Sequence, residues 1–508
     1  MALSLNSKRR FLIEELSNLF ASLGRSLRLS QRTVSLILAL SIVAVVGAIS
    51  VFWGEKLHIN GGFGWDGLIY GSVAQNLNFR VLTDFYFQRT LPSVLVHAAL
   101  AALRQPYDNQ HIVLGFGLLD LGMMLALCVL LRQIADELGL SGRGFWFVFA
   151  AIFVNVANFK LIWYFGVGTD PTAEALALAM LLFYLRGQEF LLFLASLLGA
   201  FTWPTLIYAG TFLLAIPRNP VKEEDTDGLK WVCLVLAVAV CAGAVLRYYV
   251  HHLSVSPGLA QPIRWALPFS IFFTGLYFYL GSSILLQGMS LRACLKQAVS
   301  RRIALVILLW AATWIPTYLW ADHSIETVTV QSTIRDIIVR STARPAVFLV
   351  SHPVCLGPAF LMFFMCWRSF ARIIRRYGAG LVAVISMGVF VSLTPESHQN
   401  IPIYVLAAPF LGILVDELNL PPRFYWLFGA LALLSTKVWM PMHLPAYDDG
   451  QFLRFPMQNL FMNTGVWMNN LMWIVQGAIV LAAAALLYPF VRRAMKQKGA
   501  AEPLPQLE

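Results

Sequence analysis

Long apolar runs separated by short polar stretches make up most of the chain. A helix needs about 20 apolar residues to cross the hydrocarbon core of a bilayer, and many of these runs approach that length. They cover residues 33–53, 112–131, 145–165, 172–185, 190–217, 231–250, 265–287, 303–320, 346–367, 380–393, 401–415, 424–439 and 467–490. The pattern predicts an all-α, polytopic integral membrane protein with about 13–14 transmembrane helices.

The run 190–217 is better explained by two short helices than by one long helix. Pro204 lies in its middle and interrupts the helical hydrogen-bond pattern. A single span would also export Arg218 and the later basic loops, against the positive-inside bias. We predict a second short pair at 380–393 and 401–415, joined by the turn TPESHQN.

Composition and charge support a membrane protein and exclude a soluble nucleic-acid-binding protein. Hydrophobic residues make up 58% of the 508 positions and charged residues only 12%, whereas soluble domains are about 25% charged. The net charge of +11 comes from short Lys and Arg clusters between apolar runs. Such clusters set membrane orientation and contact anionic lipids. The six cysteines have no paired spacing, so neither a disulfide framework nor a zinc site is expected.

The basic clusters predict a cytoplasmic N-terminal segment at 1–31 and a cytoplasmic tail at 491–508. The first run has no cleavage site, so we expect it to remain as the first span. Between the two ends we distinguish a core at 32–217 and further transmembrane helices at 218–490. Outer segments are then expected at 54–110, 251–264, 322–344, 395–400 and 440–466.

The outer segment 54–110 has its own helical pattern. Apolar residues recur at helical spacing around Leu68–Leu77 and again around Leu91–Leu103, with Pro92 in the first turn of the second helix. We predict two amphipathic helices at the membrane surface. Asp66 opens the first helix, where a carboxylate is either a helix cap or a catalytic group.

Under this topology, polar residues with possible functions collect on the outer face, whereas the cytoplasmic loops are short and basic. An outward-facing site acting on a lipid-borne substrate follows as a hypothesis. Each candidate also has a structural explanation: Asp170 can cap a helix, Arg89 can contact lipid headgroups, and the three arginines of 335–344 can form a solvated helix face. The candidate residues are Trp65, Asp66, Tyr70, Gln88, Arg89, Asp170, Arg335, Arg340, Arg344, Glu396 and His398.

The run GWDGLIYGSVAQNLNF, followed by YFQRTLPSVLVHAAL, resembles the first outer loop of GT-C superfamily glycosyltransferases. GVGTDPTAEALALAMLLFYL resembles their second outer loop, and FTWPTLIYAGTFLLAIP the broken helix that follows. The resemblance covers about residues 32–217, with a weaker likeness at 390–416. It implies a bacterial inner-membrane enzyme, of inverting type, that transfers a sugar from a polyprenyl phosphate to a glycan or lipid acceptor in the periplasm.

In such a reaction Asp66 would act as general base, and Arg89, Arg335, Arg340, Arg344 or His398 would stabilise the departing phosphate. Aromatic residues of the first loop would either stack on sugar rings or anchor the loop at the membrane interface: Phe63, Trp65, Tyr70, Tyr86 and Phe87. Position 65 is Trp and position 67 is Gly, so the paired acidic motif of some members is missing. No cofactor is therefore assigned, although a divalent metal remains possible. The alternatives are a transporter or flippase of lipid-linked glycans and a non-catalytic component of polysaccharide assembly.

Overall fold

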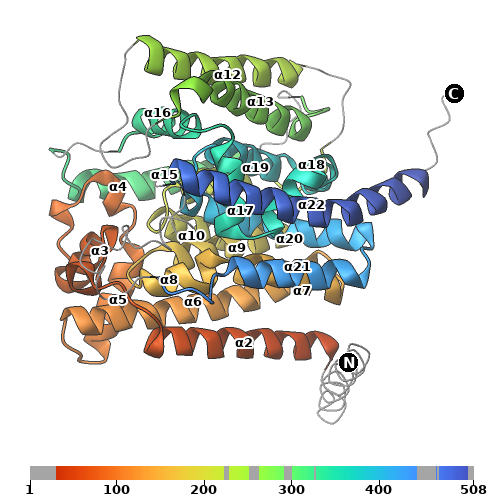
Figure 1. The fold of residues 1–508 in the computed structure, drawn as a ribbon. Coiled ribbons are helices and arrows are strands. Elements are labelled where there is room, and N and C mark those ends of the chain that lie inside the picture. Colours follow the sequence, from red (N-terminus) through yellow and green to blue (C-terminus); the bar gives the residue numbers. More distant parts are fainter. Residues whose placement is uncertain are drawn as a thin grey trace.

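The structure is a computed structural model that describes residues 30–221, 228–250, 262–290, 300–324, 328–442, 465 and 468–501. Its regular elements are all helical within these ranges (Figure 1). Most of the predicted segments 1–31, 251–264 and 440–466 lies outside the described residues, as does the end of the tail at 491–508.

The first half of the chain contains the helices of the core and of the first outer segment. They are α2 (Gln31–Trp53), η1 (Ile59–Gly62), α3 (Asp66–Asn76), η2 (Phe79–Val81), α4 (Asp84–Phe87), α5 (Leu91–Ala102), α6 (Asn109–Glu137), α7 (Gly142–Phe153), η3 (Ala157–Leu161), α8 (Ile162–Tyr164), α9 (Asp170–Arg186), α10 (Glu189–Ala200) and α11 (Thr205–Ala215). Helices α3 and α5 confirm the two helices predicted for 54–110.

The second half continues with further long helices and a short amphipathic helix, α16. They are α12 (Gly228–Val245), η4 (Leu246–Val250), η5 (Arg264–Ala266), α13 (Leu267–Leu285), α15 (Ser300–Trp320), α16 (Val330–Ser341), α17 (Val347–Leu356), α18 (Ala359–Arg376), α19 (Ala379–Val391), η6 (Ser397–Asn400), α20 (Ile401–Leu418), α21 (Pro422–Ser435) and α22 (Asn470–Ala501).

The described part confirms a multi-pass, all-α membrane protein. It contains seven helices long and apolar enough to cross a bilayer, or up to nine if two bent pairs each count as one span. Shorter apolar helices, among them α10, α11 and α19, lie between them. Helices α10 and α11 meet at a break around Pro204, and α19 and α20 meet at η6, as the sequence predicts for both short pairs.

Two predicted spans, 145–165 and 346–367, are not straight. The first bends by 58° between α7 and η3, where Val154 leaves the helical region with φ −106° and ψ 64°. The second bends by 119° between α17 and α18. Gly357 occupies the corner with φ +78°, a conformation that glycine adopts without a Cβ penalty, and Pro358 directly precedes the next helix.

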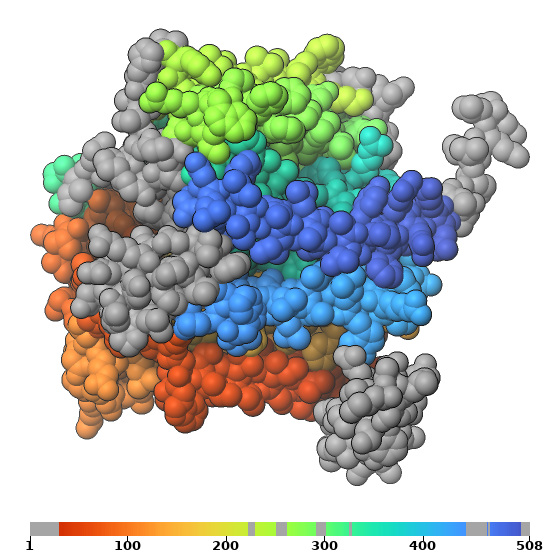
Figure 2. Space-filling model, viewed as in Figure 1, coloured from red at the N-terminus to blue at the C-terminus, as the bar shows by residue number. Residues whose placement is uncertain are grey.

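The helices enclose α9 and α20, which belong to the main apolar core together with α7, α10 and α18. Helices α12 and α13 pack on each other and form one edge of the molecule (Figures 1 and 2). Large apolar side chains such as Val235 and Phe269 are exposed there. Such a surface suits contact with acyl chains, because lipid tails are as apolar as the protein core.

The start of α2 and the end of α22 lie at the same end of the bundle, whereas α3 and α4 lie at the opposite end (Figure 1). This arrangement is the one required if both chain ends face one compartment and segment 54–110 faces the other. The assignment of these sides to cytoplasm and periplasm stays a prediction from the basic loops.

Candidate functional site

Asp66 occupies the first turn of α3, and the local sequence fixes where that turn lies. Asn60 and Gly61 both adopt positive φ, and Asn60 Nδ2 donates to the carbonyl oxygen of Gly64 at 2.7 Å. The absence of a side chain at Gly67 lets α3 approach the second outer loop, because a Cβ there would lie 2.8 Å from the carbonyl oxygen of Val167. The start of α3 therefore packs directly on the loop that leads to Asp170.

The Asp66 side chain is exposed and accepts a hydrogen bond from Tyr86 Oη at 3.4 Å. Its position in the first turn also places it in the favourable field of the helix dipole. Trp65, the preceding residue, is exposed, and its ring lies 6.0 Å from that of Phe165. The carboxylate thus stands at the rim of the site, with aromatic rings beside it.

Two tyrosines connect Asp66 to Arg89. The rings of Tyr70 and Tyr86 pack edge to face with centroids 6.1 Å apart, and Arg89 Nη1 donates to Tyr70 Oη at 3.1 Å. Burial raises the pKa of Tyr70, opposed by the nearby Arg89 charge. Burial and the Asp66 charge raise the pKa of Tyr86 to about 12. Both phenols are therefore protonated at neutral pH, and Tyr86 donates its proton to the hydrogen bond with Asp66.

Arg89 is a buried cation held between two aromatic rings. Its guanidinium carbon lies 4.0 Å from the centroid of Phe85 and 4.1 Å from that of Trp203, and the residue is only 7% exposed. Its Nε is buried without a hydrogen-bond partner, and no carboxylate of the described residues lies within ion-pair distance. Buried charges are normally paired, so a buried guanidinium with no described ion partner is a candidate ligand for an anion. Arginine binds phosphate oxygens in a bidentate manner.

Trp203 reaches Arg89 because the chain breaks between α10 and α11. The amide of Leu91 donates to the carbonyl oxygen of Phe201 at 2.9 Å, and the ring of Phe87 lies 6.0 Å from that of Phe201. The break at Pro204 therefore forms a docking point for the first outer segment. The sequence predicted the break but gave no role to Trp203.

The turn at η6 also approaches Trp203. The ring of His398 lies 5.9 Å from that of Trp203 in an edge-to-face contact. Glu396 binds Arg340 at 2.6 Å and lies 3.7 Å from His398 Nε2. The break between α10 and α11 and the η6 turn thus meet the first outer segment around one aromatic residue, Trp203.

Asp170 lies close enough to Asp66, Arg89 and His398 to interact with their charges. It lies at the start of α9, where burial raises its pKa. The nearby charges of His398 and Arg89 oppose this shift, and the charge of Asp66 adds to it. The structure therefore gathers candidates from four separate segments of the chain. The gathered residues are Asp66, Tyr70, Arg89, Asp170, Glu396, His398 and, through Glu396, Arg340.

Other candidates have different surroundings. Arg335 is exposed beside Asp336 at 3.6 Å. Arg344 is buried, its Nε donates to Asn470 Oδ1 at 3.0 Å, and burial lowers its pKa to about 10. Gln88 is buried with its Nε2 lacking a hydrogen-bond partner among the described residues. Of the three arginines of 335–344, only Arg340 forms an ion pair with Glu396, the residue directly before η6.

His352, which the sequence analysis did not select, supports the η6 turn. Its Nε2 lies 2.7 Å from the carbonyl oxygen of Ser392, and its Nδ1 lies 3.1 Å from Ser397 Oγ. Ser351 also contacts the carbonyl oxygen of Pro395. A histidine within an apolar run is costly unless it is hydrogen-bonded, and that was the available signal.

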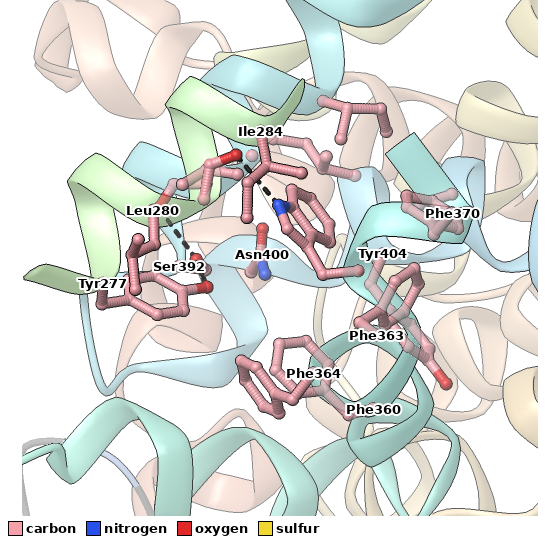
Figure 3. A pocket seen from close by; sticks show the side chains of 17 residues that line it. Tyr277, Leu280, Ile284, Phe360, Phe363, Phe364, Phe370, Ser392, Asn400 and Tyr404 are labelled. Carbon is pink, nitrogen blue, oxygen red and sulfur yellow. Dashed lines mark hydrogen bonds between the residues drawn. The ribbon is translucent and has the colours of Figure 1, made fainter. Parts of the chain in front are cut away.

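A largely apolar pocket of about 280 Å³ adjoins this turn, between α13, α18, α19 and α20 (Figure 3). Aromatic side chains such as Phe360 and Phe364 line it. Its polar groups include Tyr277 and Ser392, whose hydroxyl oxygens lie 2.8 Å apart, and Asn400. The Oδ1 of Asn400 is buried with no hydrogen-bond partner among the described residues.

Metal dependence stays as open as the sequence left it. Within the part of the chain that the structure describes, no group of three or more His, Cys, Asp and Glu side chains is placed to hold a metal ion.

No protein-family model and no curated protein matches the chain. Among solved structures, the chain is similar to the archaeal oligosaccharyltransferase AglB from Archaeoglobus fulgidus, in complex with an inhibitory peptide and a dolichol-phosphate. The identity is 12% and the TM-score 0.38, and the match covers 93% of this chain and 56% of that chain. The chain thus spans a little over half the length of that protein.

Proposed function

We propose that this protein is a membrane glycosyltransferase that moves a sugar from a polyprenyl-phosphate donor to an envelope glycan or lipid on the periplasmic side. The observation that carries the proposal is the buried Arg89 guanidinium, free of carboxylate ion pairs among the described residues and connected to the Asp66 carboxylate through Tyr70 and Tyr86. An anion-binding cation and a candidate base thus occur at one site.

The reaction forms a bond between an acceptor oxygen and the anomeric carbon, and it breaks the bond between that carbon and the phosphate oxygen. Asp66 takes the hydroxyl proton as the acceptor oxygen attacks, a function that contributes about 10²–10⁴-fold in comparable enzymes. Arg89 stabilises the negative charge that develops on the departing lipid phosphate. The sugar inverts its anomeric configuration, because a single displacement occurs.

The apolar pocket beside η6 gives the donor lipid a place for part of its chain. Its aromatic and aliphatic walls suit isoprene units, and Asn400 supplies a polar group in the same turn as His398 (Figure 3). A lipid whose chain occupies this pocket would carry its phosphate toward the outer turns. The membrane itself, rather than a soluble nucleotide pool, then delivers the donor.

The rival function is transport of a lipid-linked glycan, and one observation favours it. Asp120 and Glu174 are buried within α6 and α9, where ionisable groups often mark transport pathways. Asn158 Nδ2 donates to Glu174 Oε2 at 2.6 Å, which gives Glu174 a structural partner as well.

The decisive experiment compares Asp66→Asn with the wild type in proteoliposomes that contain a labelled polyprenyl-phosphate sugar and candidate acceptors. We expect turnover to fall by about 10²–10⁴-fold, because the amide cannot accept the proton. Asp322→Asn, an acidic residue outside the gathered group, should retain wild-type turnover. Full turnover of folded Asp66→Asn would refute the general base. Wild-type translocation of a lipid-linked glycan without sugar transfer would establish the transporter instead.

A further inference from the structure

A second pocket lies at the end of α9 opposite to Asp170, beside basic residues near the ends of α9 and α11. It has a volume of about 280 Å³ and lies where α9 ends, α10 begins, α11 leads into Pro217 and α15 begins. Three arginines line it together with one carboxylate, that of Glu189: Arg186, Arg218 and Arg302. The lining therefore carries more cationic than anionic side chains.

Two of these arginines are neutralised by protein carboxylates. Arg302 Nη2 lies 2.8 Å from Glu189 Oε1, and Arg186 Nε lies 2.8 Å from Glu137 Oε1. These ion pairs hold the two guanidinium groups in place at the wall of the pocket. The remaining positive charge of the lining therefore belongs to Arg218.

Arg218 has no carboxylate partner among the described residues. Its Nη1 donates to the carbonyl oxygen of Leu185 at 2.8 Å, and its guanidinium carbon lies 5.0 Å from the ring centroid of Tyr377. These contacts orient the guanidinium without neutralising it. Arg218 is exposed, and its remaining N–H groups have no other partner among the described residues.

The other walls indicate what kind of anion fits. Phe183, Leu185 and Leu192 contribute apolar surface to the same pocket. On the predicted topology this end faces the cytoplasmic leaflet, whose anionic lipids attract basic residues near the surface. A phospholipid places a phosphate next to apolar groups, which matches cationic and apolar walls in one cavity.

We propose that this pocket binds a phosphate group and that its occupant is the headgroup of an anionic phospholipid of the cytoplasmic leaflet. The lipid bridges the ends of α9, α11 and α15, with Arg218 as the principal phosphate ligand. This site is independent of the proposed transfer reaction, and its occupancy stabilises the helix ends that it joins.

The test uses the full-length protein in detergent and follows the midpoint of thermal unfolding during titration with phosphatidylglycerol, phosphatidylcholine or inorganic phosphate. We expect phosphatidylglycerol to raise the midpoint and phosphatidylcholine to have little effect. Arg218→Gln should weaken the apparent affinity for phosphatidylglycerol by about fivefold, the effect of one basic residue near a lipid surface. Arg372→Gln removes an exposed arginine at the same end but outside the pocket, and it should leave the affinity unchanged.

Arg218→Lys provides a second variant that keeps the charge if the Gln variant fails to fold, and it should lie between wild type and Gln. An equal response to inorganic phosphate, lost in Arg218→Gln, would support the phosphate site with a soluble occupant in place of a lipid. The proposal is overturned if neither phosphate source shifts the midpoint, or if Arg218→Gln and Arg372→Gln respond alike.

Discussion

Replacing Arg89 tests whether its positive charge serves sugar transfer or only the stability of the fold. The guanidinium lies between Phe85 and Trp203 at 4.0 and 4.1 Å, donates to Tyr70, and has no ion pair with a described carboxylate. For a cation with a structural role, contacts within the protein compensate the free energy lost when its charge is buried. For a ligand-binding cation, part of that loss is compensated only when the ligand binds.

The effect of Arg89→Gln on the free energy of unfolding can be estimated from the contacts of Arg89. Arg89→Gln loses two cation–π contacts, each worth about 2 kcal/mol when desolvated, and one hydrogen bond worth about 1 kcal/mol. It also removes a buried charge without an ion partner, and the desolvation penalty of such a charge is several kcal/mol. The two changes oppose each other, so we expect the free energy of unfolding to change by no more than about 2 kcal/mol.

Catalysis should respond much more strongly. Loss of one group that stabilises a developing negative charge costs about 10²–10³-fold in kcat. We expect Arg89→Gln to show that loss, and Arg89→Lys to recover part of it. Lysine keeps the charge but neither stacks as a plane nor binds phosphate bidentately.

The assay measures kcat and KM for sugar transfer in proteoliposomes, alongside thermal unfolding of the same preparations. Arg80→Gln is the matched control, because Arg80 belongs to the same outer segment and is exposed. A folded Arg89→Gln protein with wild-type kcat would refute the phosphate-binding role. Unfolding at ambient temperature, with Arg80→Gln stable, would instead identify Arg89 as a structural cation.

Three further outcomes follow from the same geometry. Trp203→Leu should reduce transfer about tenfold or more through loss of a cation–π contact of about 2 kcal/mol, measured as kcat/KM at unchanged expression. Asn158→Leu should destabilise the fold by about 1–3 kcal/mol, because Glu174 Oε2 loses its 2.6 Å donor; adding Glu174→Gln should restore part of the thermal midpoint, and no restoration would contradict the pairing. Cysteines placed at Arg80 and Arg301, in a background free of native cysteines, should react with impermeant reagents from opposite sides of the membrane, and labelling from one side would overturn the topology.

Much of the local structure could be predicted from the sequence. Apolar runs long enough to span a bilayer predicted the helices, and Pro204 predicted the break between α10 and α11. The helical periodicity of 54–110 predicted α3 and α5. The bends at Val154 and Gly357 were missed, because hydropathy is the same for a straight helix and for one that turns within protein.

For the candidate site, too, some features could be predicted from the sequence and others depended on tertiary structure. The sequence alone determined a many-span helical membrane protein and marked Asp66, Arg89, Asp170 and His398 as polar residues of its loops, since these properties depend on composition and local order. Tertiary structure alone decided that Trp203 lies between Arg89 and His398, because that contact joins segments separated by more than a hundred residues. It also decided that Arg89 has no carboxylate partner among the described residues, since pairing depends on which charges packing brings within a few ångströms.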